Sequence, residues 1–164
     1  GRQSRPFVSA LTQDDARELL YVVGEIEGLA AWRAARRPDR DSLVSELERI
    51  NGELLAEAEG SPPSRDRIFL LDTTFHRTYV EGGAGPRLLA LHDSIKPQAE
   101  RYTRLYIEAL LDKLPVSVSE HQSIIDCIAS GDQDQAQRMV QTNWRNAAER
   151  LSAVIERAGE LGSW

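Results

Sequence analysis

The chain has 164 residues, 41% hydrophobic and 28% charged, which suits one soluble domain with a full core and excludes a disordered chain. A formal charge of −6 makes it a poor binder of polyanions such as DNA by itself. No apolar run approaches the roughly 18 residues that span a bilayer, and the start, GRQSRPFVSA, lacks the apolar core of a signal peptide. We predict a cytoplasmic protein without a membrane partner. The single cysteine, Cys127, lies in the apolar run IIDCIA and is predicted to be buried filler.

Helical spacing of apolar residues recurs along the chain. It covers residues 19–30, 43–55, 68–79, 88–110, 119–129 and 136–155. A capping-box pattern at Thr12 precedes the first segment, and Pro38 ends it. Pro97 lies inside the fourth segment and predicts a kink, while Pro115 is expected to separate the fourth helix from a fifth over Ser119–Ala129. No segment alternates like a strand, so we predict an all-α fold, a single bundle of about six or seven helices.

Asp72 and His76 are four residues apart in the third helical segment, DTTFH. At this spacing the two side chains share one face of a helix and can aim at one point. The pair is therefore a candidate half of a metal or ligand site. The alternative is a carboxylate–imidazole contact at the rim of the core, which such a pair makes more often.

Other polar residues have both a structural and a functional interpretation. His121 precedes Ile124 and Ile128 at helical spacing, so it is expected to point toward the core. His92 is interpreted as a solvated or rim residue. Arg101 and Arg104 are interpreted as a surface face that, in a functional role, would bind a ligand carboxylate. The arginine-rich run at residues 33–40 is interpreted as a solvated helix end.

The combination of motifs resembles a known family. DTTFH, the turn GAGPRL, the Glu-His pair of SEHQSIIDCI, and the later Ser-Gly-Asp with Ala136 follow one another in the order and spacing of the FCD domain. This is the all-helical effector-binding domain of the FadR-like branch of GntR-family transcription regulators. The segment LLYVVGEIEGLAAWRAA also resembles that domain's first helix, with Val23 where many relatives have an arginine. The resemblance covers roughly residues 12–155.

The resemblance implies an internal ligand or metal cavity. Many members bind a divalent metal through one Asp and three His, and the matching positions here are Asp72, His76, His121 and Asn143. Asparagine is a weaker ligand for zinc or nickel than imidazole. Either the three remaining side chains hold the metal with open positions, or the site is metal-free and Asn143 hydrogen-bonds the effector directly.

The implied function is effector sensing and dimerisation. Residues 1–11 are expected to be a linker remnant and residues 12–164 the effector-binding domain, in a homodimer that binds a small organic acid. Contact with operator DNA would come only through a winged-helix domain that this chain does not contain. Two alternatives stay open: a metal-dependent helical enzyme, for which Glu120 is the nearest base but faces away from His121, and an interaction bundle without a pocket.

Overall fold

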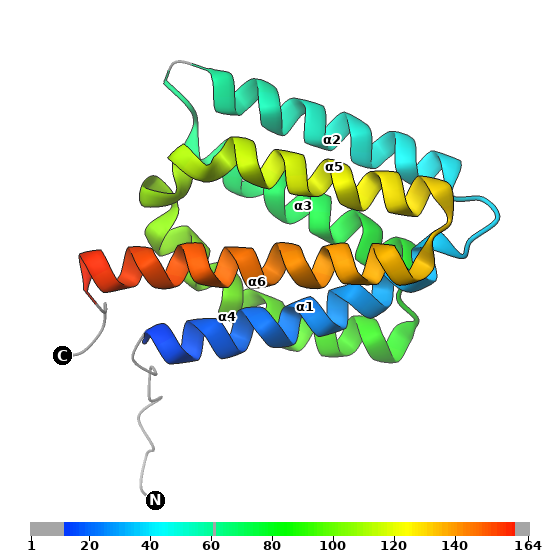
Figure 1. Cartoon of the computed structure of the whole chain (residues 1–164), viewed down its shortest axis with the longest axis horizontal. Helices are drawn as coiled ribbons and strands as arrows, with labels where there is room; N and C mark the ends of the chain where they lie inside the picture. The colour runs from blue at the N-terminus through cyan, green and yellow to red at the C-terminus, as the bar shows by residue number, and fades with distance from the viewer. Residues whose placement is uncertain (1–11, 61, 160–164) are drawn as a thin grey trace, which may run out of the picture.

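The computed structural model describes residues 12–60 and 62–159, which form one bundle of helices (Figure 1). The elements are α1 (Gln13–Ala35), α2 (Asp41–Glu59), α3 (Arg65–Gly83), α4 (Pro86–Leu110), the short 3-10 helix η1 (Leu111–Lys113), α5 (Leu114–Ser130) and α6 (Gln133–Ala158). The described residues contain no strand, so the predicted all-α bundle is confirmed. Within the same residues, no helix combines the length and apolarity needed to cross a membrane.

Helix boundaries follow local capping chemistry. The side chain of Thr12 accepts a hydrogen bond from the backbone N–H of Asp15, as the capping pattern predicts. The Asp132 side chain caps α6 in the same way, by accepting from the N–H of Gln135. Gly131 ends α5 in the left-handed conformation, with φ of 76°, which glycine adopts without a steric penalty. These caps fix where the helices that carry the site begin and end.

One boundary differs from the sequence prediction. α5 begins at Leu114 rather than Ser119, so Pro115 lies in its first turn. The first turn needs no backbone donor from Pro115, and the proline starts this helix instead of delaying it. α4 runs from Pro86 to Leu110 as one element with Pro97 inside it.

α1 and α6 pack closely along most of their lengths and run side by side across the bundle in Figure 1. Gly24 permits this approach, because a Cβ atom there would lie 2.9 Å from Cβ of Trp144. Gly83 plays the same part where α3 meets α1, since its Cβ would lie 1.9 Å from the carbonyl oxygen of Ala30. α1 thereby contacts α3, α4, α5 and α6 and forms the centre of the bundle.

The arginine run over residues 33–40, at the C-terminal end of α1, is not simply the solvated helix end that the sequence suggested. Arg33 donates a hydrogen bond to the carbonyl of Gly83, and Arg37 donates to the carbonyl of Gly82. Arg40 donates to the carbonyl of Ala129. Guanidinium groups satisfy carbonyls that have no partner at the C-terminal ends of α3 and α5, where the helix dipole also favours positive charge. The run therefore joins three helices.

Candidate metal centre

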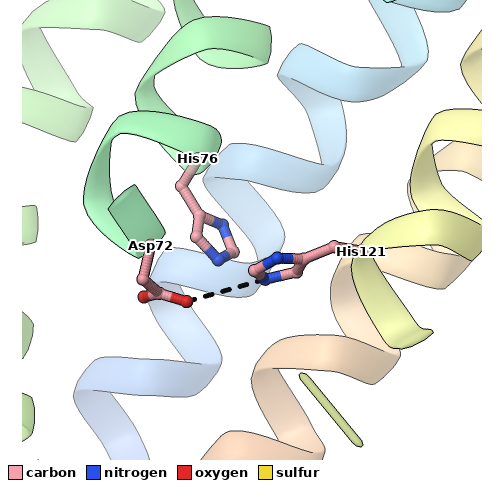
Figure 2. A group of neighbouring side chains, drawn as sticks. All are labelled: Asp72, His76 and His121. Carbon is pink, nitrogen blue, oxygen red and sulfur yellow. Dashed lines mark ion pairs between the residues drawn. The ribbon is translucent and has the colours of Figure 1, made fainter. Parts of the chain in front are cut away.

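Asp72, His76 and His121 meet inside the bundle, between α3 and α5 (Figure 2). Each offers one ligand atom, and these atoms all lie within 4.8 Å of one another. The Asp72 Oδ1 and His121 Nε2 atoms are 3.7 Å apart, too far for a hydrogen bond. Ligands around a tetrahedral zinc are about 3.4 Å apart, given metal–ligand distances of about 2.1 Å. A small movement that shortens the distances between these ligand atoms would bring them to the spacing found around a bound metal ion.

His121 is almost fully buried and packs flat against Phe75, with ring centroids 4.0 Å apart and an interplanar angle of 11°. The prediction that it points into the core is confirmed. Burial lowers the pKa of His121 well below its ordinary value, because a charged imidazole loses its hydration there. The ring is therefore neutral, as a metal ligand must be. Its Nδ1 atom is buried without a hydrogen-bond partner in the described residues.

A buried carboxylate lies directly behind His76. Glu27, on α1, is fully buried, and its Oε2 atom is 2.8 Å from Nδ1 of His76. The same oxygen accepts from the hydroxyl of Tyr79 at 2.5 Å and from the indole Nε1–H of Trp144 at 2.7 Å. Sequence reasoning missed this residue, although a signal was present. Glu27 is four residues after Val23 and three before Ala30, within the buried stripe of α1.

The second oxygen of Glu27 faces α4. It lies 2.9 Å from Nε2 of His92 and 2.7 Å from Nζ of Lys96. His92 is therefore not the solvated or rim residue that the sequence suggested, because its ring is buried against this carboxylate. Burial alone would raise the pKa of Glu27, but Lys96, His76 and His92 hold that pKa well below its ordinary value. The carboxylate is ionised inside the core.

The three candidate ligands open into a cavity of about 100 Å³, much larger than the roughly 10–15 Å³ that holds one water molecule. Its wall includes Asp72, His76, His121, Asn143 and Arg150, beside apolar side chains such as Leu20 and Ile107. An apolar cavity with a few convergent polar groups is the usual form of a small-molecule site. The described part of the chain thus contains a cavity where the resemblance implied one.

Asn143 lines this cavity and is buried, but its amide is already held. Its Nδ2 donates to Oε2 of Glu120 at 2.8 Å. Arg150 binds the same carboxylate through two parallel hydrogen bonds of 3.0 Å. Although burial acts to raise the pKa of Glu120, the donors Arg150, Asn146 and Asn143 hold it below its ordinary value. Glu120 is absent from the cavity wall and orients two residues that belong to it.

Arg101 and Arg104 do not reach the cavity. Both are exposed, and Arg104 lies 3.8 Å from the carboxylate of Asp66 with its guanidinium over the ring of Phe69. The arginine in the cavity wall is Arg150, which sequence reasoning did not single out. Cys127 also differs from expectation, because it is half-buried rather than buried.

The model of the FCD domain family matches residues 18–146, most of the chain. The chain belongs to the FCD family. FCD domains are the C-terminal effector-binding domains of GntR-family transcription regulators, and some members bind metals. A comparison with curated proteins gave no match. The family identified from the motifs is confirmed.

The residues of this FCD domain suit a divalent metal. A carboxylate oxygen and two imidazole nitrogens are ligands that zinc and nickel accept, and three protein ligands leave positions open for another molecule. Asp72 is only partly buried and lines the cavity, so a molecule in the cavity can reach a metal ion held beside Asp72. The sequence prediction of Asp72, His76 and His121 as one cluster agrees with this geometry, while the binding of a metal stays a prediction.

Proposed function

We propose that this FCD domain senses a small organic acid and that a divalent metal held by Asp72, His76 and His121 binds the acid's carboxylate. The observation that carries the proposal is the convergence of these three ligands on the wall of an otherwise largely apolar cavity. Zinc and nickel are the metals that this ligand set favours. Asn143 donates its NH₂ group to Glu120, which leaves its carbonyl oxygen as the atom that it could offer to the metal or to the acid.

Arg150 is the second group proposed to recognise the acid. Its two hydrogen bonds to Glu120 use two of the five N–H donors of a guanidinium, and it lines the cavity. The remaining donors are of the type that binds carboxylates in a planar fork. This assigns to Arg150 the role that the sequence gave to Arg101 and Arg104. A metal at one end and a guanidinium at the other would select a small molecule with oxygen ligands.

Regulation is proposed to follow from a movement of the helices around the cavity. The effector can shift the domain between two states only through its different affinity for them. A homodimer is proposed to transmit that shift to a winged-helix DNA-binding domain. Val22 and Leu29, exposed and seven residues apart on α1, are apolar side chains that could contribute to a dimer contact.

The test is a thermal-shift experiment on metal-free and zinc-loaded protein with acetate, succinate and citrate. A ligand that binds only the folded state raises the melting temperature, and tighter binding at the same concentration raises it further. We expect at least one acid to stabilise the zinc-loaded protein more than the metal-free protein, and the effect to weaken in Arg150→Met. Arg104→Met is the matched control and should behave like the wild type. Equal shifts with and without zinc would contradict the proposed role of the metal.

A further inference from the structure

Glu27 accepts hydrogen bonds at both oxygens, and this fixes the proton positions around it. An ionised carboxylate has no proton to donate, so each polar atom at hydrogen-bond distance from it must be a donor. The Nδ1 atom of His76, 2.8 Å from Oε2, therefore carries a proton. Tyr79 directs its one hydroxyl proton at Glu27 across 2.5 Å, so its oxygen, 2.8 Å from Nδ1 of His76, can only accept a hydrogen bond from that ring.

A neutral imidazole protonated at Nδ1 has its lone pair on Nε2. In Figure 2 the ring nitrogen of His76 that is farther from its backbone faces Asp72 and His121. We propose that Glu27 is a positioning residue that holds His76 in the tautomer and orientation required of a metal ligand, and that Lys96 secures Glu27 from α4. This inference rests on the proposed metal site and extends it to two helices, α1 and α4, that supply none of the three candidate ligands.

The other candidate ligand provides a contrast. Nδ1 of His121 has no hydrogen-bond partner in the described residues, so nothing comparable orients its ring except the stacking on Phe75. Partners that fix the second nitrogen of a ligating histidine typically change metal affinity by about 10- to 100-fold when they are removed. Of the two histidines, His76 is therefore the one whose hydrogen-bond partner, Glu27, should affect metal affinity.

Glu27→Gln tests the inference because the amide has two different ends. Lys96, 2.7 Å from Oε1, attracts the amide oxygen to its own side. The NH₂ group then faces His76, Tyr79 and Trp144: the indole N–H, which can only donate, loses its acceptor, while Nδ1 of His76 becomes an acceptor and its proton moves to Nε2. A protonated Nε2 cannot bind a metal. We expect the zinc affinity of Glu27→Gln to fall about 10- to 100-fold.

Tyr79→Phe is the matched control. It removes a buried donor from the same oxygen of Glu27, together with the hydroxyl oxygen 2.8 Å from Nδ1 of His76, but leaves the contact between Glu27 and His76 in place. Its zinc affinity should stay within about threefold of the wild type. If Glu27 were only a structural residue, both variants would change zinc affinity in proportion to their loss of stability. Equal zinc affinity in wild type and Glu27→Gln would overturn the inference.

The tautomer of His76 in the metal-free wild type tests the inference without requiring that any variant folds. Two-bond ¹⁵N–¹H correlation spectra of ¹⁵N-histidine-labelled protein distinguish the two neutral forms. We expect His76 to be protonated at Nδ1, and protonation at Nε2 would overturn the inference even if Glu27→Gln did not fold. Failure of the metal site itself is distinguishable, because the wild type would then bind no zinc at all.

Discussion

Lys96→Met isolates the energetic role of the buried ion pair. Nζ of Lys96 lies 2.7 Å from Oε1 of Glu27, and the two residues are 6% and 0% exposed. Breaking a buried pair by removing one partner costs about 3–5 kcal/mol, because the other charge stays buried without compensation. Four other donors would still bond the carboxylate, which places the loss near the lower limit, at about 3 kcal/mol. Methionine keeps the packing of the alkyl chain but not the contact between the ammonium and the ring of Trp144.

The double variant Lys96→Met with Glu27→Gln completes this test. With both charges removed, the amide oxygen can accept from His76, Tyr79 and Trp144, and the amide NH₂ can donate to His92. We expect the double variant to be more stable than Lys96→Met alone, with a coupling of about 1–3 kcal/mol. Urea unfolding at pH 7 with a chelator present, followed by circular dichroism, measures each free energy. Destabilisation equal to the sum of the two single variants would refute the account of the pair.

Three further predictions concern stability and binding. Burial lowers the pKa of His121, so at low pH the unfolded chain takes up a proton that the folded protein excludes. The free energy of unfolding of the metal-free protein should therefore fall as the pH drops below about 6.5. This residue contributes up to about 1.4 kcal/mol per pH unit. Urea unfolding at pH 7 and pH 5.5 should show a smaller loss in His121→Asn, and an unchanged pH dependence would contradict the assignment. Gly83→Ala should destabilise by about 3 kcal/mol or more, because its Cβ meets backbone atoms of α1, whereas Gly52→Ala, which has open space, should stabilise by about 0.5–1 kcal/mol. Equal melting temperatures for these two glycine variants would contradict the close crossing of α1 and α3. Arg150→Met should weaken stabilisation by carboxylates without removing zinc binding, which equilibrium dialysis with zinc can check.

The sequence predicted the helices well because apolar periodicity and breakers act locally. The start of α5 was wrong, since Pro115 can either end a helix or occupy a first turn and only the surrounding packing decides. Asp72 and His76 were found because four-residue spacing on a helix is a local property. Their proximity to His121 came from the family resemblance, because no local pattern reports which helices become neighbours.

The parts of the site that the sequence missed depend on contacts between distant segments. Glu27 and Lys96 are 69 residues apart, and neither charge alone predicts that the other lies beside it. Arg150 was not singled out, because only the packing of α6 places it against Glu120 and the cavity. Arg104, which was chosen instead, pairs with Asp66 outside the cavity. A charged residue on an apolar stripe, as at Glu27, is the one signal that could have been used.

Calorimetric titration of zinc into metal-free protein tests the central claim most directly. The account predicts about one zinc per chain, bound by wild type and lost or strongly weakened in Asp72→Asn. Asp72 is only partly buried and belongs to the cavity wall, so this substitution should leave the fold intact. A wild type that binds no zinc or nickel, or an Asp72→Asn variant that binds zinc as tightly as wild type, would contradict the claim that these three side chains form a metal centre.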